Sequence, residues 1–470
     1  MADWRGMAEK GTVADPLEAG WVALGEGRWA DARSCFEASL VAGETPEALE
    51  GLGWAGFCLD DDALTFDARE RAYRGYRARR DDRSAARVAS WSATDCVAFR
   101  GQAAVARGWL QRAHRLLDGL DPGADHGWLA FHEGSVGLSV DEDTAAARLL
   151  GARAADLGRR FGVAELEMLG LGLEGRALVT EGDLDEGMRR LDEATAAALS
   201  GEATILSCVS WACCYLITAC ERVRDFERAA QWCVRVGEFC ERHRIDLFLG
   251  VCRTHYGGVL TWEGRWEEAE SELSAAADAL AASRPAMSGD ALVRLAELRR
   301  RQGRLAEAEE LFARCEGHAL SALGRAALAL DRGRPEEAVE LAERFLRRFP
   351  DPIRVERCAG LEVAVRAHAR LGDLAAAREA VGQLRGIAAR AGIGSLRAAV
   401  LAAEGVVAAA AGDHAAARRS FEDALDLYAA SNAGFEVARV RLELAAVLAA
   451  LGRREAARRE IDAALAALQR

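Results

Sequence analysis

The stretch VLAAEGVVAAAAGDHAAARRSFEDALDL, residues 400–427, decides the fold. It reads as two helices that meet at a turn. Gly412 can end the first helix because glycine adopts positive φ at little cost, and Asp413 can accept hydrogen bonds from the free amides that open the second. The second helix carries small and apolar residues on one face: Ala417, Phe421, Ala424 and Leu425. The stretch therefore predicts a closely packed antiparallel helix pair.

The same pattern returns along the chain. It occurs in GRWADARSCFEASL (27–40), GDLDEGMRRLDEA (182–194), GRWEEAESELSAA (264–276), GRLAEAEELFARC (303–315), GRPEEAVELAERFL (333–346), GDLAAAREAVGQL (372–384), GDHAAARRSFEDAL (412–425) and GRREAARREIDAAL (452–465). The last six turn glycines follow one another at steps of 39, 30, 39, 40 and 40 residues. A fixed period in this range is typical of stacked helical repeats.

The order of residues in these phrases resembles the tetratricopeptide repeat: glycine at the turn, then alanine, an aromatic residue or leucine four positions on, and alanine three beyond that. The usual unit of that family is about 34 residues. Degenerate copies at 85–117 and 213–240 fill the gaps between the clear ones. The resemblance implies an all-α fold, a helix-turn-helix solenoid in the form of a right-handed superhelix of about twelve helix pairs.

The domain organisation follows from the repeats. We expect a flexible N-terminus over residues 1–16 and a single solenoid over residues 17–470, because one helix pair cannot bury its apolar face alone and stacked neighbours share a continuous core. The step of 30 between Gly303 and Gly333 is shorter than the others. It indicates either a boundary between two sub-arcs near residues 285–330 or a deletion within one repeat.

Charge and composition exclude several classes of function. The formal net charge is −13, which argues against unspecific nucleic-acid binding by this chain. Arginine runs at 299–304 and 344–348 are interleaved with glutamate, so we interpret them as solvated helix faces. Lys10 is the only lysine and does not stand in a G-x-x-x-x-G-K-[ST] sequence, which excludes a P-loop and other lysine-based chemistry.

No sign of membrane insertion or secretion is found in the sequence. The N-terminus has no apolar core of a signal peptide. We take residues 400–411 as the closest approach to a membrane span, and this stretch is too short and contains Glu404. We therefore expect a cytoplasmic protein with mostly reduced cysteines.

Seven of the twelve cysteines fall between Cys208 and Cys252. Cys233 and Cys240 share one helix face, as do Cys252 and His255. No C-x-x-C knuckle occurs, so we assign no metal ligand and no cofactor. The cluster is either a set of small apolar packing residues or a ligand or redox site. The candidates for such a site are Cys213, Cys214, Cys220, Cys233, Cys240, Cys252 and His255, with His243 nearby.

Three consecutive aspartates, Asp60, Asp61 and Asp62, follow an apolar helix. They could hold a divalent cation. We interpret them instead as a charged cap of the next helix.

Several longer phrases resemble the helical-repeat region of actinobacterial LuxR-type transcriptional regulators. They are ETPEALEGLGWAGFCLDD (44–62), ARERAYRGYRARRD (68–81), AVARGWLQRAHRLLDGL (104–120), CCYLITACERVRDFERAAQWC (213–233), YGGVLTWEGRWEEAESEL (256–273) and RLAELRRRQGRLAEAEELF (294–312). In such regulators the repeats sense a signal or partner, and a C-terminal helix-turn-helix domain binds DNA. This sequence shows no opening of that domain. The resemblance therefore implies a sensor region or a stand-alone repeat protein, and no DNA binding is carried over.

Three hypotheses about function follow. The first is a non-enzymatic regulatory module whose concave groove binds a protein, a peptide or a small effector. The second is a small-molecule, metal or redox sensor centred on the cysteine cluster. The third is an enzyme, which no catalytic motif supports. We expect no membrane partner, and we keep a homodimer open.

Overall fold

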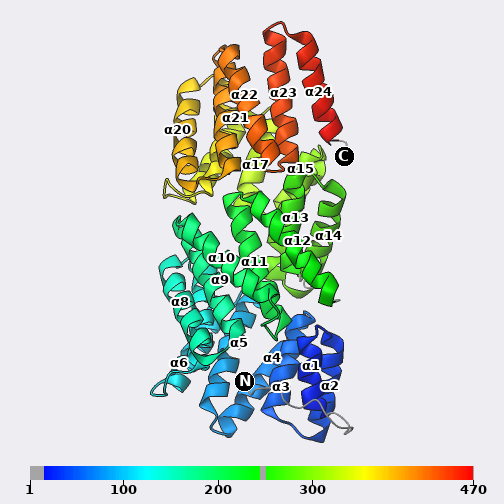
Figure 1. Ribbon diagram of the computed structural model, residues 1–470, viewed down its shortest axis with the longest axis vertical. Helices are drawn as coiled ribbons and strands as arrows, with labels where there is room; N and C mark the ends of the chain where they lie inside the picture. The colour runs from blue at the N-terminus through cyan, green and yellow to red at the C-terminus, as the bar shows by residue number, and fades with distance from the viewer. Residues whose placement is uncertain (1–14, 244–249, 469–470) are drawn as a thin grey trace.

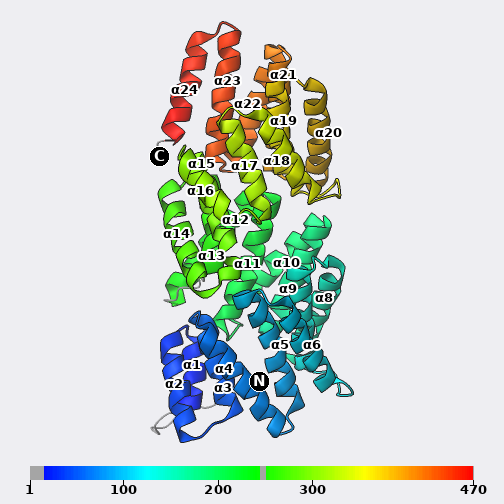
Figure 2. The ribbon, with the colours of Figure 1, turned by 180° about the vertical axis from the view of Figure 1, so that it is seen from behind.

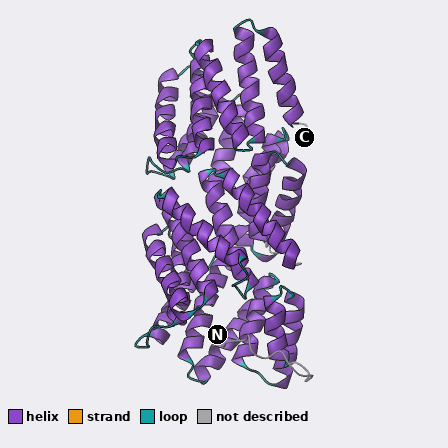
Figure 3. Cartoon of the chain, viewed as in Figure 1, coloured by secondary structure: helices purple, strands orange, loops and turns teal. Residues whose placement is uncertain are grey.

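The computed structural model describes residues 15–243 and 250–468 of the chain. Helices joined by turns and short loops make up these residues. These residues form 24 α-helices and one short 3-10 helix, and no strand (Figure 1; Figure 3). The first helices of the pairs are α1 (Pro16–Gly25), α3 (Pro46–Cys58), α5 (Asp82–Arg100), α7 (Ala124–Val140), α9 (Ala164–Glu181), α11 (Leu206–Val223), α13 (Gly250–Glu263), α15 (Ser288–Arg301), α17 (Ala319–Asp331), α19 (Arg357–Leu371), α21 (Gly394–Ala410) and α23 (Gly434–Ala450). The second helices are α2 (Trp29–Ala42), α4 (Asp62–Ala78), α6 (Ala103–Leu117), α8 (Thr144–Phe161), α10 (Leu184–Leu199), α12 (Phe226–His243), α14 (Trp266–Ser283), α16 (Leu305–Arg314), α18 (Pro335–Arg347), α20 (Leu374–Ala391), α22 (His414–Ala430) and α24 (Arg454–Leu468). The predicted solenoid of about twelve helix pairs is confirmed.

The turn between the helices of a pair has the predicted chemistry. Gly412 has a φ of 81°, and Asp413 accepts a hydrogen bond of 2.9 Å from the backbone N–H of Ala416. Behind the turn, Ala417 and Phe421 are buried between α21 and α22. The repeated phrase therefore encodes both the turn and the packing of the pair.

The first helices form the inner wall of the solenoid, and several of them are largely buried. Inner helices of neighbouring pairs pack directly on one another, as α5 does on α7 and α11 does on α13. In α3 nearly every residue is buried, and in α9 and α11 most residues are buried. The concave groove that we expected is therefore filled along these three helices, because each is covered by the second helices outside it and by its neighbours inside the superhelix.

The chain climbs from the N-terminal helices at the bottom of Figure 1 to the C-terminal helices at the top, and successive turns of the superhelix touch (Figures 1 and 2). The lower contact, which we call the lower seam, consists of Phe57, Asp60 and Arg284. The Nε of Arg284 lies 2.7 Å from Asp60 Oδ1, and its Nη2 donates to the carbonyl oxygen of Phe57. These groups are 224 and 227 residues apart in the sequence.

The second contact joins the middle of the chain to its last third, and we call it the upper seam. Arg224, in a left-handed turn after α11, forms an ion pair with Glu362 of α19. The hydroxyl of Ser395 donates to the carbonyl oxygen of Arg224 at 2.6 Å, and the indole N–H of Trp262 donates to the carbonyl oxygen of Ser431 at 3.2 Å. These polar contacts and the ring contact of Trp262 with Tyr428 join one turn of the superhelix to the next.

One described helix, α11, is long and apolar enough to cross a membrane by length and composition. It has a mean hydropathy of 1.2 over 18 residues, and 78% of that stretch is buried inside the structure. Our choice of residues 400–411 as the closest approach to a membrane span was wrong, since that stretch is shorter and the cysteines of α11 are apolar. The burial of α11 among other helices accounts for its apolar composition.

Three smaller expectations have structural outcomes. Asp61 accepts a hydrogen bond from the N–H of Leu64 and so caps α4, which confirms the capping interpretation for Asp61, whereas Asp60 and Asp62 pair with arginines. The expected flexible segment 1–16 falls mostly on residues 1–14, which lie outside the described residues.

The proposed boundary near 285–330 stays a prediction. A 3-10 turn at Pro285–Met287 and the short α16, of ten residues, lie there.

The interpretation of the first arginine run as a solvated face was wrong for three of its members. The side chains of Arg299, Arg300 and Arg301 are 9–13% exposed and pair with acidic groups on α14, α15, α17 and α23. They lie at the C-terminal end of α15, where its neighbours converge on it. These arginines are internal links between helices.

Candidate functional site

The predicted site residues lie on three successive helices of the middle of the chain. Cys214 on α11 and Cys252 on α13 are joined by a disulfide, with their Cα atoms 5.6 Å apart. Both are buried, and the Sγ of Cys252 also lies 3.2 Å from the hydroxyl of Ser210. The disulfide therefore links the inner helices of two consecutive pairs.

The other four candidate cysteines lie between α11 and α12. Cys213 and Cys220 are buried on α11, and Cys233 and Cys240 of α12 pack against the same apolar core. Burial raises the pKa of Cys213 and of Cys233 to about 12, and it raises the pKa of Cys220 well above the ordinary value. As neutral thiols at physiological pH, these three act as small apolar packing residues.

No group of three or more His, Cys, Asp or Glu side chains that could hold a metal ion occurs in residues 15–242 and 250–468. The side chain of His243, which the sequence places near the cluster, lies outside the described residues. The thiols that the sequence groups together are therefore divided between a disulfide and an apolar core.

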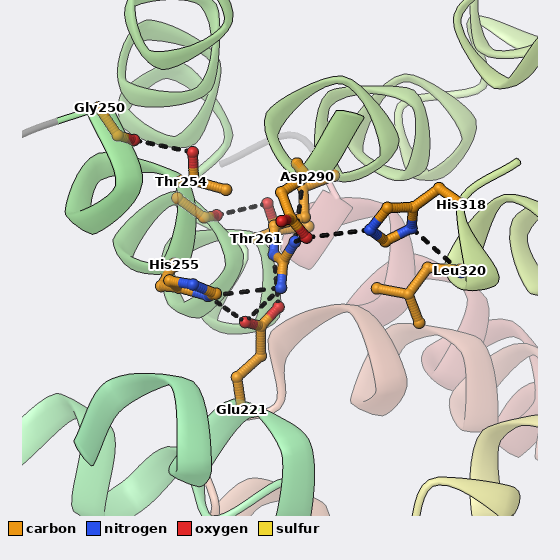
Figure 4. A network of polar contacts seen from close by, with 10 residues as sticks. Glu221, Gly250, Thr254, His255, Thr261, Asp290, His318 and Leu320 are labelled. Carbon is orange, nitrogen blue, oxygen red and sulfur yellow. Dashed lines mark hydrogen bonds and ion pairs between the residues drawn. The ribbon is translucent and has the colours of Figure 1, made fainter. Parts of the chain in front are cut away.

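His255 takes part in a chain of polar side chains that crosses four inner helices (Figure 4). We call Glu221, His255, Arg294, Asp290 and His318 the ionic ladder. Arg294 Nε and Nη2 lie 2.8 Å from the two carboxylate oxygens of Glu221, and His255 Nδ1 lies 2.9 Å from Oε2. Asp290 Oδ1 lies 3.3 Å from Arg294 Nη1 and 3.0 Å from His318 Nε2. The ladder connects α11, α13, α15 and the start of α17.

The sequence around the ladder leaves room for it. Gly258 lies on α13 one helical turn after His255, and a Cβ at that position would come within 2.8 Å of Glu221 Oε1. A side chain there would displace the carboxylate from Arg294. The glycine thus allows α13 to pass close to the ion pair between α11 and α15.

The two carboxylates of the ladder, Glu221 and Asp290, are held in their ionised forms. Burial alone would raise the pKa of Glu221, but the charge of Arg294 and the hydrogen bonds from His255 and Arg294 lower it to about 2. Burial opposes ionisation of Asp290 in the same way, and its hydrogen bond to His318 together with the charge of Arg294 keeps its pKa below the ordinary value. The ladder is therefore a paired ionic network at neutral pH.

The disulfide and the ladder occupy the same contact between α11 and α13. Glu221 lies two turns after Cys214 on α11, and His255 lies one turn after Cys252 on α13. The predicted shared helix face of Cys252 and His255 is confirmed, since both face α11. The disulfide and the polar contacts of the ladder can hold the inner helices together. The covalent link between Cys214 and Cys252 depends on the oxidation state of the thiols.

Sequence reasoning missed the acidic and arginine members of the ladder. The available signal is the repeat period: Glu221, His255 and Arg294 are 34 and 39 residues apart, about one repeat each. Charged residues at matching positions of consecutive inner helices can meet across the helix contacts. The apolar surroundings of Glu221 in LITACERV add to that signal.

A pocket of about 350 Å³ lies beside the upper seam. It is bounded by the turn between α13 and α14 and by the starting residue of α23. The lining residues are Glu263, Gly264, Arg265, Trp266, Glu267, Glu268, Gly434 and Ala467. None of the predicted site residues lines it.

The comparisons with known proteins concern the repeats and the fold. The tetratricopeptide repeat family matches residues 290–316 and 319–352, which comprise the pairs α15–α16 and α17–α18. No curated protein matches the chain.

Among solved structures, the chain is similar to a chain in the crystal structure of the APC/C hetero-tetramer Cut9-Hcn1 (15% identity, covering 97% of this chain and 87% of that chain, TM-score 0.44). It is similar to a Rap protein complexed with competence and sporulation factor (12% identity, covering 82% of this chain and 98% of that chain, TM-score 0.42). It is also similar to yeast Tom70 (14% identity, covering 94% of this chain and 96% of that chain, TM-score 0.37).

Proposed function

We propose that this chain is a non-enzymatic regulatory module that binds a protein or peptide partner, or a small effector, through its inner helices. The observation that carries the proposal is the solenoid of twelve helix pairs, two of which match the tetratricopeptide repeat. Stacked repeats of this kind expose extended surfaces suited to peptides and helices. The module acts in the cytoplasm.

In this proposal the closed superhelix is the resting state. The inner surface is filled along α3, α9 and α11, and the seams combine ion pairs, such as Arg224 with Glu362 and Arg284 with Asp60, with the ring contact of Trp262 and Tyr428. The polar contacts re-form with water when they open, which lowers the cost of separating the seams. A partner that binds the open form better shifts the population toward it.

The experiment is a selection of binders from a random peptide library, followed by hydrogen exchange of the complex. We expect peptides that slow exchange in the inner helices α11, α13, α15 and α17 and speed it in α19, α21 and α23, which lie across the upper seam. Arg294→Gln should weaken binding, whereas Arg189→Gln, a control at an exposed ion pair with Glu186 on the second helix α10, should not. Peptides that protect only the second helices, or binding equal in both variants, would contradict the proposal.

We also propose that the module is the sensory part of a LuxR-type transcriptional regulator. The support is the resemblance of the phrases at 44–62, 213–233 and 256–273. The test is the natural reading frame beyond codon 470, together with the transcriptome of a deletion strain. A helix-turn-helix domain in that frame, or a regulator encoded beside it that binds this chain, supports the assignment. An unchanged transcriptome speaks against it.

A second candidate function, a redox sensor, rests on the disulfide between Cys214 and Cys252. Oxidation by hydrogen peroxide would remove one proton and one electron from each thiol and reduce the hydrogen peroxide to two waters. We expect the reduced protein to lose two hydrogen masses on treatment, with Cys214 and Cys252 protected from alkylation. Cys252→Ser should abolish this change and Cys233→Ser should not. Protection at other cysteines would exclude the pair as the sensor.

A further inference from the structure

Two arginines from distant parts of the chain converge beside the upper seam. Arg222, in the last turn of α11, and Arg354, in the loop before α19, share the carboxylate of Glu356. Oε1 of Glu356 lies 3.2 Å from Arg222 Nε and 2.8 Å from Arg354 Nη2. Arg222 Nη1 also donates to the hydroxyl of Thr180 on α9. These contacts join α11 to the segment that leads into α19, as the upper seam does.

A third arginine, Arg176, lies beside them without a carboxylate partner. It stands one turn before Thr180 on α9, and the Thr180 hydroxyl donates to its carbonyl oxygen at 2.8 Å. Its guanidinium lies over the ring of Tyr215, 4.6 Å from the ring centre. Among the described residues Arg176 forms no ion pair, and positions 172, 173, 179 and 180, its neighbours at helical spacing, are not acidic. Exposed arginines elsewhere, such as Arg189, pair with carboxylates one turn away.

The three guanidinium groups act on one another electrostatically. Partial desolvation lowers the pKa of Arg222, and the charges of Arg176 and Arg354 lower it further, while the charge of Glu356 opposes them. Three positive charges therefore face one carboxylate whose side chain is only 13% exposed. Two positive charges are left over within the cluster.

The cluster has donors available for a ligand. Within the described part of the chain, Arg222 Nη2, Arg354 Nη1 and the guanidinium of Arg176 donate no hydrogen bond. The side chains of Arg222 and Arg354 are 37% and 21% exposed, so a solute can reach them. The other acidic groups that act on Arg354, Glu142 and Asp351, are exposed, and solvent screens their charges.

We propose that Arg176, Arg222 and Arg354 form an oxyanion site that binds the phosphate or carboxylate groups of a small effector. The proposal rests on the proposed function, since it assigns a site and a ligand chemistry to the effector of that module. Arginine forks match the paired oxygens of both groups, and two uncompensated positive charges fit a doubly charged ligand. A bound anion links α9 and α11 to the loop before α19 and so favours the closed superhelix.

The test is isothermal titration calorimetry of the whole chain with inorganic phosphate and, separately, with malonate, each up to about 10 mM. We expect saturable binding. Tighter binding of phosphate indicates a phosphorylated effector, and tighter binding of malonate indicates a dicarboxylate. Arg176→Gln should weaken binding at least about tenfold, and Arg176→Lys, which keeps the charge, should weaken it less. The matched control is Arg189→Gln, which removes one charge from an exposed ion pair on α10.

Two results would overturn the proposal. One is that neither anion binds at about 10 mM, and the other is that Arg176→Gln and Arg189→Gln bind equally well. Neither result decides the proposed function, because the peptide selection has its own readout in hydrogen exchange and its own variant at Arg294. Circular dichroism checks that Arg176→Gln keeps its helices. If it does not, Arg354→Gln, in the loop before α19, takes its place in the titration.

Discussion

Single residues of the ionic ladder carry an acid-dependent part of the stability. The pKa of Glu221 lies at about 2 in the folded chain, below the ordinary value of 4.5. A group with a lowered pKa stabilises the folded state fully above its unfolded value, and this contribution is lost as the pH falls toward the folded value. The ladder should therefore weaken between about pH 4.5 and pH 2.

We predict that Glu221→Gln costs about 3 to 5 kcal/mol of unfolding free energy at pH 7, because it leaves Arg294 buried without its carboxylate. The variant should also lose less stability than the parent when the pH falls from 6 to 3. Urea unfolding at a series of pH values measures both. Glu310→Gln, on an exposed position of α16, should stay within about 0.5 kcal/mol of the parent. Equal acid sensitivity of the parent and Glu221→Gln would refute the assignment.

The sequence predicted part of this site. The shared face of Cys252 and His255 followed from helical spacing, because only one helix is involved. The pairing of His255 with Glu221 and Arg294 could not be derived in the same way, since it depends on how far three helices are rotated about their own axes. That the candidate residues bind a ligand or respond to oxidants stays a prediction.

The helix pair as an element is specified almost entirely by local sequence. All six turn glycines from 264 to 452 that define the period have positive φ, as predicted. The number of pairs follows from counting, because each turn and each small residue acts within about 30 residues. The burial of the inner helices could not be predicted in the same way. Local sequence showed that they are apolar, but only the assembled superhelix shows that neighbouring helices cover both sides of α3, α9 and α11.

The aspartate after the turn should contribute measurably to the pairs that have one, such as α19–α20 and α21–α22. Asp413 and Asp373 occupy the same position in consecutive pairs and accept from the N–H of Ala416 and Ala376. We predict that Asp413→Ala costs about 1 kcal/mol, while Asp413→Asn, which can still accept the hydrogen bond, costs less. Chemical denaturation measures the difference. The capping role fails if alanine and asparagine are equivalent at this position.

At the scale of the whole molecule, the seams determine the shape of the superhelix. Gly434, the first residue of α23, lies so close to the turn after α13 that a Cβ would come within 2.6 Å of the carbonyl oxygen of Glu263. Gly394 occupies the equivalent position one period earlier, and the nearest atom to a Cβ there, the hydroxyl oxygen of Ser431, is 3.7 Å away. One glycine is required by the seam and the other is not.

We predict that Gly434→Ala destabilises the chain by about 1 to 3 kcal/mol, because backbone blocks the new methyl group. Gly394→Ala should be neutral or slightly stabilising. Denaturation of both variants measures this, and hydrogen exchange at α13 and α23 shows whether the loss is at the upper seam. Similar losses in both variants would mean that the close approach at Gly434 has no energetic weight.

The seams were not predictable from the repeats. They join residues separated by several periods, and the pitch that brings them together is the sum of small rotations over all the pairs between them. Arg224 and Glu362, for example, stand in unrelated phrases of the sequence. The short step between Gly303 and Gly333 lies within this interval, and its effect on the pitch could not be calculated from its length.

The upper seam also has a consequence for how the protein is made. Trp262 and Ser431 are 169 residues apart, so at about 5 to 20 residues per second the ribosome needs about 10 to 30 s to deliver the second after the first. Throughout that time the apolar ends of α11 and α13 are outside the ribosome without the helices that later cover them. The middle third of the nascent chain is therefore the segment on which chaperones should act.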